Sequence, residues 1–305
     1  GGAKFGCSLI LTAGGGLVYQ SDVGRLRRVL LKHARGAFVN QERINAQWQN
    51  LNYEGPPDFQ RACAESDALA GLLEGLGVVV EWMPEEDIGM DSLYVRDASL
   101  VTNSGAVLCR MGKHARAHEP ARQGLEYAEL GIYVAGQIEG NGTVEGGDAT
   151  WLSSGCLAVG RGYRTNQDGI DQLRALLGED VELIEVPLPH WKGTGDVFHL
   201  MSMVSPLAED LLLVYSPLLP VPFRETLVDR GFSLVEVPTA EFESMGCNVL
   251  AVAPRVALAV KGNPETRRRM EAAGVEVHSY HGTEISLKGC GGPTCLTRTL
   301  ERNAV

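Results

Sequence analysis

The chain of 305 residues lacks an excess of basic residues and contains no long apolar run. Lysine and arginine total 27 against 38 aspartates and glutamates, which gives a formal net charge of −11. Proteins that bind nucleic acid or anionic membranes need clustered positive charge, so the composition argues against both classes. No stretch of 18 consecutive apolar residues occurs, and we therefore expect no membrane-spanning helix.

Cysteine is sparse and irregularly placed. Seven cysteines occur, and the closest two, Cys290 and Cys295, have four residues between them and no His-x-x-x-His motif after them. This pattern excludes a disulfide framework and a structural zinc site. We expect most of these residues to be buried thiols in a cytoplasmic protein. The run Gly14-Gly15-Gly16 lacks the spacing of a nucleotide-binding motif, so we expect no nucleotide cofactor. We also expect no metal.

A pattern of helix, glycine and strand recurs five times along the chain. In each copy an apolar helical run ends at a glycine, and a short β-rich segment follows at once. These glycines are Gly77, Gly131, Gly178, Gly231 and Gly274, at intervals of 54, 47, 53 and 43 residues. A glycine after a helix supplies the left-handed backbone conformation that ends it. A recurrence of this period indicates a repeat architecture.

Pairs of short strands lie between these units. Each pair is a β-rich segment interrupted by a turn, and the pairs are 98–109, 149–159, 201–215 and 249–260. The first has an Asn103-Ser104-Gly105 turn, which is typical of two antiparallel strands. Each unit therefore reads as strand, strand, helix, strand. The N-terminal segment, with a helix near 57–76, would complete the unit begun by the C-terminal strand.

Closing such units into a ring leaves no exposed sheet edge. We therefore predict an α/β fold with five ββαβ repeats around a central active-site channel, a pseudo-symmetric five-bladed propeller. No linker rich in proline or serine divides the chain, so we expect one domain over residues 1–305. Two ordinary α/β domains with chance similarity are the alternative.

Polar residues stand at the equivalent position of each unit, where its strand pair opens. They are Asp97, Glu145, His199, Asn248 and Cys295. In a closed ring, equivalent positions of successive units converge on the axis, so these residues would share one pocket although the first and last lie 198 positions apart. A thiol, an imidazole and two carboxylates together form a catalytic set.

The residue types indicate the chemistry of this set. Cys295 follows a Gly291-Gly292-Pro293 turn, and glycine lets the backbone approach a ligand closely. A thiolate is a strong nucleophile, and an imidazole such as His199 can donate a proton to a departing nitrogen and later activate water. Two carboxylates suit a planar guanidinium. A cysteine protease has a similar composition, but it needs one orienting residue rather than two acids.

Five motifs, in this order, resemble the guanidine-modifying enzymes of the pentein superfamily. They are Asp91-Ser-Leu-Tyr-Val-Arg96-Asp97, Glu145-Gly-Gly-Asp148, Arg164-Thr-Asn-Gln167, His199-Leu-Met-Ser202 and Gly291-Gly-Pro-Thr-Cys295. The resemblance runs from about residue 24 to 300. Members of the superfamily include dimethylarginine dimethylaminohydrolases, arginine deiminases and amidinotransferases. The resemblance implies a five-bladed α/β propeller, in agreement with the repeats.

The resemblance also implies a role for each site residue. The catalytic residues would be Cys295, His199 and Glu145, and the substrate-binding residues would be Asp97, Arg164, Arg110, Asp91 and Asp148. The cysteine would form a covalent thiouronium-type intermediate, and the histidine would act as general acid and base. Glu145 and Asp97 would bind the guanidinium, while the two arginines would bind substrate carboxylate.

Structural roles are the alternative for each of these residues. The thiol and the imidazole could be buried core groups, the acids could be turn or cap residues that bind backbone amides, and the arginines could form surface ion pairs. Cys290 could pair with Cys295 on oxidation, and Asn248 could be a turn residue.

Two positions combine features of different branches of the superfamily. Arginine deiminases and amidinotransferases usually carry an aspartate two residues after the catalytic histidine, where this chain has Met201; this favours a dimethylargininase-like enzyme. Dimethylargininases often carry Glu-Asp where this chain has Arg96-Asp97, and this arginine is deiminase-like.

We therefore expect a hydrolase that cleaves a C–N bond of an arginine-like, possibly N-methylated, guanidino compound and releases an amine or ammonia and a ureido product such as citrulline. Arginine deiminase, arginine dihydrolase or amidinotransferase activity on the same scaffold is the alternative, and a propeller that binds a macromolecule without catalysis is a more remote one. The expected partner is a small guanidino or ureido compound, with no nucleic acid and no membrane. A homo-oligomer stays open, and residues 40–57 could form a flap over the site.

Overall fold

The structure, a computed structural model, describes residues 17–18, 20–195 and 198–305. Its strands form five small sheets, and each sheet is one blade of a ring. Blade 1 contains β1 (Leu17–Val18), β16 (Arg298–Asn303), β2 (Leu26–Leu31) and β3 (Val79–Trp82). Blade 2 contains β4 (Ser99–Thr102), β5 (Gly105–Leu108) and β6 (Val134–Gln137), and blade 3 contains β7 (Ala149–Ser153), β8 (Cys156–Arg161) and β9 (Glu182–Pro187). Blade 4 contains β10 (Val204–Ala208), β11 (Leu211–Val214) and β12 (Ser233–Glu236), and blade 5 contains β13 (Leu250–Ala253), β14 (Val256–Val260) and β15 (Glu276–Tyr280).

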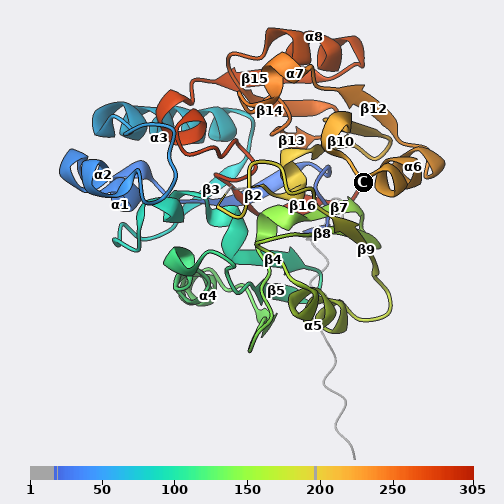
Figure 1. Ribbon diagram of the computed structural model, residues 1–305, viewed down its shortest axis with the longest axis horizontal. Coiled ribbons are helices and arrows are strands. Elements are labelled where there is room, and N and C mark those ends of the chain that lie inside the picture. The colour runs from blue at the N-terminus through green and yellow to red at the C-terminus, as the bar shows by residue number, and fades with distance from the viewer. Residues whose placement is uncertain (1–16, 19, 196–197) are drawn as a thin grey trace, which may run out of the picture.

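The helices lie mainly on the outside of the ring. They are α1 (Ala34–Phe38), α2 (Gln41–Gln47), α3 (Phe59–Gly75), α4 (Glu119–Glu129), α5 (Gln167–Leu177), α6 (Val221–Asp229), α7 (Thr239–Phe242) and α8 (Pro264–Ala272). Figure 1 shows α3, α4, α5, α6 and α8 one after another around the rim. Within the described part of the chain, no helix combines the length and the apolar character needed to cross a membrane.

All five blades have the same connectivity. The first and second strands of a blade are antiparallel, as in β4–β5 and β7–β8. The second and third strands are parallel, as in β5–β6 and β8–β9. Parallel neighbours need a crossover connection, and the helices of the rim supply it. The predicted ββαβ repeat is therefore confirmed.

Blade 1 closes the ring by joining the two ends of the chain. Its strand β16, near the C-terminus, pairs antiparallel with β2, with Arg298 opposite Leu30. β2 in turn pairs parallel with β3. The predicted completion of the last unit by N-terminal residues is thus confirmed, and it supports our proposal that residues 1–305 form one domain.

The glycines that mark the repeats have the expected backbone conformation. The φ angles are +83°, +71°, +77°, +87° and +82° at Gly77, Gly131, Gly178, Gly231 and Gly274. A residue with a Cβ atom is strained at such angles. Each glycine therefore lets the chain leave its helix and enter the third strand of the blade directly.

One strand pair begins later than its sequence pattern predicts. The segment 201–215 was expected to start with a strand, but Leu200–Ser202 forms a 3₁₀ turn, η5, and β10 begins at Val204. The Oγ atom of Ser202 accepts a hydrogen bond from the backbone N–H of His199 at 3.2 Å. Such local side-chain bonds compete with strand formation.

The first strands of the blades surround the axis of the ring. β7 and β13 both contact β10, while β4 contacts β16. Every residue of β10 and of β13 is buried. Among the described residues, none of the six cysteines forms a disulfide; Cys7 and Gly14–Gly16 lie outside this part.

Buried arginines link the first strands of different blades. Nη1 of Arg302 donates hydrogen bonds to the carbonyl oxygens of Gly24 at 2.6 Å and Ala251 at 2.8 Å. Nη1 of Arg298 donates to the carbonyl oxygen of Ser99 at 2.6 Å. Both guanidinium groups are fully enclosed, so these bonds tie together backbone that the sheets alone do not connect.

Asp22 carries the negative charge that opposes these arginines. Its Oδ1 atom accepts a hydrogen bond from Nη2 of Arg96 at 3.0 Å. Burial would raise the pKa of Asp22, but the charges of Arg96, Arg302 and Arg298 outweigh this effect and hold the pKa below its ordinary value of 3.8. The carboxylate is therefore ionised wherever the protein is folded near neutral pH.

Replacing this carboxylate should destabilise the fold. Asp22→Asn leaves the three arginine charges without their counter-ion, and breaking a buried pair in this way costs about 3–5 kcal/mol. The wild type has this stabilisation above pH 3.8 and loses it as the pH falls further. Thermal denaturation between pH 3 and 7 measures both effects. Asp210→Asn is the control, because that carboxylate pairs with Arg255 at the surface; equal melting of the two variants at pH 7 would contradict the prediction.

Candidate active site

The five predicted site positions lie at the same place in successive blades. Asp97, Glu145, His199, Asn248 and Cys295 each stand two to five residues before the first strand of a blade, namely β4, β7, β10, β13 and β16. Three of them lie in or next to the 3₁₀ turns η2 (Val95–Ala98), η4 (Gly146–Asp148) and η5. These turns contact one another, so the predicted convergence on the axis is present in the structure.

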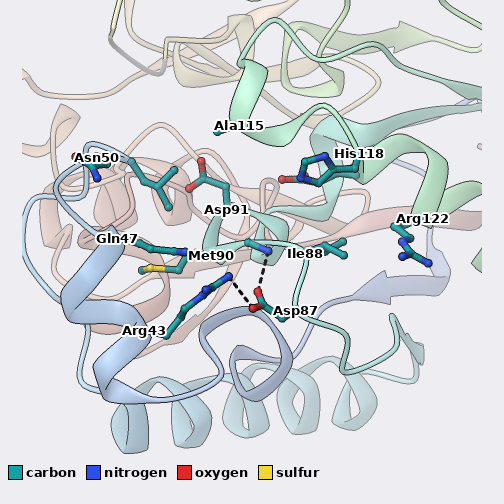
Figure 2. Close-up of a pocket in the computed structure, with 13 residues that line it drawn as sticks. Arg43, Gln47, Asn50, Asp87, Ile88, Met90, Asp91, Ala115, His118 and Arg122 are labelled. Carbon is teal, nitrogen blue, oxygen red and sulfur yellow. Dashed lines mark hydrogen bonds and ion pairs between the residues drawn. The ribbon is translucent and has the colours of Figure 1, made fainter.

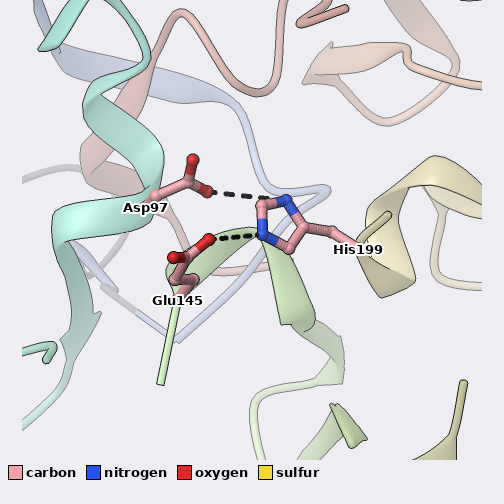
Figure 3. A group of neighbouring side chains, drawn as sticks. All are labelled: Asp97, Glu145 and His199. Atoms are coloured by element: carbon pink, nitrogen blue, oxygen red, sulfur yellow. Dashed lines mark hydrogen bonds and ion pairs between the residues drawn. The ribbon is translucent and has the colours of Figure 1, made fainter. Parts of the chain in front are cut away.

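His199 lies between two carboxylates (Figure 3). Its Nε2 atom is 2.8 Å from Oε2 of Glu145, and its Nδ1 atom is 3.8 Å from Oδ1 of Asp97. Gly147 lies against both the imidazole and Asp97, so a Cβ atom there would collide with them. The absence of a side chain at this position lets the three groups come together.

Three neighbouring carboxylates keep the imidazole protonated. Burial would lower the pKa of His199, but the charges of Asp97, Asp148 and Glu145 and the bond to Glu145 raise it to about 9. Burial would likewise raise the pKa of Glu145, but His199 and Arg164 hold it well below its usual range. The resting site therefore contains an imidazolium and a carboxylate at neutral pH.

Cys295 is held by an asparagine of the neighbouring blade. Nδ2 of Asn248 lies 3.2 Å from Sγ of Cys295, while its Oδ1 atom accepts hydrogen bonds from the N–H and the hydroxyl of Thr294 at 3.1 and 2.8 Å. A Cβ atom on Gly292 would collide with the Asn248 amide. Asn248 is therefore more than a turn residue, because its amide positions the sulfur.

The surroundings of the Cys295 thiol favour its neutral form. Burial and the negative charge of Asp97 raise the pKa of Cys295 above its ordinary value of 9.0. The hydrogen bonds from Asn248 and Thr294 and the charge of Arg96 oppose this shift only in part. Formation of a thiolate needs a further positive charge close to the sulfur.

Two neighbouring spaces share Cys295 as a lining residue. The inner pocket is narrow, about 20 Å³, and is lined by Leu51, Asn52, Asp91, Tyr94, Asp97, Lys113, Arg116, Arg164, His199, Gly289, Cys290, Gly291 and Cys295. The outer cavity has a volume of about 370 Å³ and shares His199, Cys290 and Cys295 with the inner pocket. The thiol and the imidazole therefore face both spaces.

Two of the predicted substrate-binding residues line the inner pocket beside Asp97. Arg164 is nearly enclosed, and its Nη1 atom lies 3.3 Å from Oε2 of Glu145. Asp91 forms an ion pair with Lys113, in which Oδ2 and Nζ are 2.6 Å apart. Both residues are therefore brought to the site, and each is already paired with a residue of the chain.

The other two predicted substrate-binding residues line neither the inner pocket nor the outer cavity. Arg110 is exposed, and its Nη1 atom donates to the carbonyl oxygen of Gly142 at 3.4 Å. Asp148 is buried, and its two oxygens accept hydrogen bonds from Thr165 at 2.6 Å and from the N–H of Leu200 at 3.0 Å. Asp148 thus holds the turn that carries His199, and burial raises its pKa to about 6.

Sequence reasoning missed Lys113 and Arg116, which line the inner pocket. Nη1 of Arg116 lies 2.5 Å from Oδ2 of Asp97, and its other nitrogens bond to Glu119 at 2.8 and 2.9 Å. Arg110 stands six positions earlier in the same basic segment, and we expected it to be the second carboxylate-binding arginine beside Arg164. The spacing of Arg116 and Glu119 was the available signal, although it is also typical of a surface pair on a helix.

Asp97, Glu145 and His199 offer donor atoms within 4.8 Å of one another, a spacing that a metal ion could use. The guanidinium groups of Arg116 and Arg164 already bond to the two carboxylates. A divalent cation would lie against these positive groups, which disfavours it electrostatically. Chemistry without a metal stays our prediction.

Comparison with known proteins places these observations in a family. The family model for N,N dimethylarginine dimethylhydrolase, eukaryotic, matches residues 36–302. An arginine deiminase of Rhodococcus erythropolis is 27% identical over 245 residues, which is 69% of this chain and 60% of that protein. An arginine deiminase of Mycobacterium marinum is likewise 27% identical, over 248 residues, with the same coverage. The chain thus spans about 60% of the length of these curated relatives.

Solved structures share the fold. The dimethylarginine dimethylaminohydrolase of Pseudomonas aeruginosa, solved with citrulline, has a TM-score of 0.73 at 22% identity and covers 90% of this chain and 100% of its own. The N-terminal domain of ArgZ, an arginine dihydrolase of cyanobacteria, has a TM-score of 0.75 at 21% identity, with 91% and 98% covered.

The family match over residues 36–302, together with the five-bladed fold, identifies a protein of the pentein superfamily. Within it, the chain belongs to the dimethylarginine dimethylaminohydrolase family.

Removing the partner of the imidazolium should lower the pKa of His199. In Glu145→Gln one of the three carboxylates that raise this pKa to about 9 is lost together with its hydrogen bond, so the histidine should titrate at a lower pH while Asp97 and Asp148 still raise its pKa. The wild-type pair contributes stability that is complete below pH 6.5 and is lost as the pH rises through about 9. NMR titration of the imidazole and thermal denaturation from pH 6 to 10 test this. Glu129→Gln, at an exposed position, is the control; an unchanged midpoint in Glu145→Gln would contradict it.

Proposed function

We propose that the protein hydrolyses a C–N bond of a guanidino compound, with Cys295 as the nucleophile. The observation that carries this proposal is the shared pocket: Cys295 and His199 line the same narrow space as Asp97, and Glu145 lies directly behind the imidazole. A thiol beside an imidazolium and two acids suits attack on a planar cation.

The first half of the reaction uses the substrate charge. A guanidinium bound beside Asp97 places its positive carbon near Cys295 and favours transfer of the thiol proton to water, because an adjacent cation stabilises a thiolate. The sulfur then bonds to that carbon. His199 donates its proton to the departing nitrogen, the C–N bond breaks, and an amine or ammonia leaves behind a thiouronium-type intermediate.

The second half restores the enzyme. His199, now neutral, accepts a proton from a water molecule as the water oxygen bonds to the carbon. The tetrahedral adduct collapses with rupture of the C–S bond, its hydroxyl proton passes to the departing sulfur, and a ureido product and the neutral thiol are released. The same residue therefore serves first as acid and then as base, and no redox partner is needed.

The outer cavity is the space through which the leaving amine would depart. Its walls include the apolar side chains of Trp191, Phe198, Met201, Phe242 and Met245. Met201 lies in the 3₁₀ turn that follows His199. Glu54, Lys192 and Glu243 also line this cavity. The apolar part of its wall suits a methylated or larger leaving amine, which supports a dimethylargininase-like reaction.

Amidino transfer is the second candidate. The outer cavity, about 370 Å³, reaches Cys295 and His199, so an amine acceptor could take the place of water. Transfer would yield a new guanidino compound, whereas hydrolysis yields a ureido compound. Incubation with a guanidino donor in the presence and absence of amines, followed by mass spectrometry of the products, separates the two.

We also propose that the protein works in the cytoplasm, as the irregular cysteine content suggests. A small guanidino or ureido ligand is supported by the relatives named for arginine, dimethylarginine and citrulline. A homo-oligomer, the absence of a cofactor and the residue roles stay predictions.

Substitution of the nucleophile should abolish turnover. Cys295→Ser replaces the sulfur with a much weaker nucleophile, so kcat should fall by about 10³-fold or more. Turnover of a guanidino panel and intact-protein mass of a quenched reaction should show a covalent adduct in the wild type and none in the variant. Cys63→Ser, on α3, is the matched control. Retained turnover in Cys295→Ser would remove the nucleophile assignment.

The thiol should respond to the charge of a reagent. Because burial and Asp97 raise the pKa of Cys295 above its ordinary value of 9.0, alkylation by neutral iodoacetamide should be slow at pH 7.5 and should accelerate as the pH rises. The rate constant for cationic 2-chloroacetamidine divided by that for iodoacetamide should be about tenfold higher for Cys295 than for free cysteine. Peptide mass spectrometry of the Cys295 segment measures both rates. Equal ratios for protein and free cysteine would contradict substrate-assisted ionisation.

A further inference from the structure

The ammonium group of Lys113 is held by two oxygen acceptors on the wall of the inner pocket. Nζ of Lys113 lies 2.6 Å from Oδ2 of Asp91 and donates to the carbonyl oxygen of Leu51 at 3.0 Å. The side chains of Lys113 and Asp91 are 14% and 9% exposed. One charged and one neutral acceptor thus hold a primary ammonium in a nearly enclosed position.

The other acid of the inner pocket is also paired. Asp97 binds Arg116, with Nη1 and Oδ2 2.5 Å apart. Behind the pocket, Glu145 lies against both His199 and Arg164. Among the described residues that line the inner pocket, the acids are Asp91 and Asp97, and each already has a cation from the chain.

A second space adjoins Asp91 from the other side and offers no better place for a cation. This side cavity, about 540 Å³, shares Leu51 and Asp91 with the inner pocket (Figure 2). Its acid Asp87 is bound by Arg43 at 2.7 Å, and its acid Glu119 is bound by Arg116 at 2.8 Å. A second positive group on a substrate would meet paired acids in both spaces.

Positive groups, in contrast, outnumber the acids on the pocket wall. Lys113, Arg116 and Arg164 line it together with the imidazolium of His199, against Asp91 and Asp97. A carboxylate at the end of the substrate distant from the guanidinium would find cationic partners, in particular Arg164, whose contacts with Glu145 are long at 3.3 and 3.4 Å. An α-ammonium would meet Lys113 and be repelled.

We infer that the substrate is a guanidino carboxylic acid without an α-ammonium group, because Lys113 fills the ammonium site beside Asp91 and Leu51. This inference rests on the proposed function and narrows its substrate class. Hydrolysis of such a compound would consume water and yield the corresponding ureido acid and ammonia or an amine.

Three compounds of one chain length test the inference. Arginine and 5-guanidinopentanoate differ only in the α-ammonium group, and pentylguanidine lacks the carboxylate as well. Wild-type kcat/KM should be at least about tenfold higher for 5-guanidinopentanoate than for either of the others. A preference for arginine would overturn the inference and leave the proposed hydrolysis intact.

Lys113→Met should change this preference. The variant leaves Asp91 and the Leu51 carbonyl free to bind a substrate ammonium, so the ratio of kcat/KM for arginine over 5-guanidinopentanoate should rise by about tenfold. Lys261→Met, on the exposed surface, is the matched control and should leave the ratio unchanged. In the double variant Asp91→Asn, Lys113→Met the gain should vanish, because the charged acceptor is gone. An unchanged ratio in folded Lys113→Met would overturn the assignment.

Binding provides a readout that does not need turnover. Calorimetric titration of Cys295→Ser with the same three compounds should give the tightest binding for 5-guanidinopentanoate. Equal or tighter binding of arginine would overturn the inference. Binding of 5-guanidinopentanoate without any product or covalent adduct in the wild type would instead overturn the proposed function.

Discussion

The buried ion pair between Glu145 and His199 is the interaction on which the site depends. Both side chains are almost completely enclosed, so each charge would be costly without the other. The pair fixes the direction of the imidazole and keeps a proton on it. Cys295 consequently faces an acid rather than a base, and the thiol cannot be deprotonated by its neighbour. Chemistry at this sulfur therefore favours a substrate that brings its own positive charge, which a guanidinium does.

The ring geometry explains how distant residues form this site. Each blade begins its first strand near the axis, and the residues just before that strand form a circle of five positions. Buried arginines bond to the backbone near these positions. Arg96 bonds to Asp22 through its side chain, and its backbone N–H donates a hydrogen bond to the carbonyl oxygen of Cys295 at 3.2 Å. The stability of the ring and the placement of the nucleophile are thus physically coupled.

The sequence was sufficient to predict the ring and its five converging positions. Glycines such as Gly131 and Gly231 need a left-handed conformation, and their regular spacing reveals the repeat. It was not sufficient to choose between Arg110 and Arg116, because both follow β5 in one basic segment. The choice depends on which way the chain turns after that strand, and here Arg110 lies at an isolated bridge to Val144 while Arg116 turns inward.

The ion pairs of Asp91 and Asp97 could not be predicted from the motifs. Motifs identify Asp91 and Asp97 as acids of the site, and acids alone suggest a pocket that accepts two positive groups. The contacts show that Lys113 and Arg116 already neutralise them. In the proposed reaction the guanidinium can still be accommodated, because its charge joins a network in which His199 would give up its proton as the leaving nitrogen departs. The charge of an α-ammonium group would stay in the pocket throughout this reaction. We therefore expect Lys113 to disfavour guanidino substrates that carry an α-ammonium group over those that lack it.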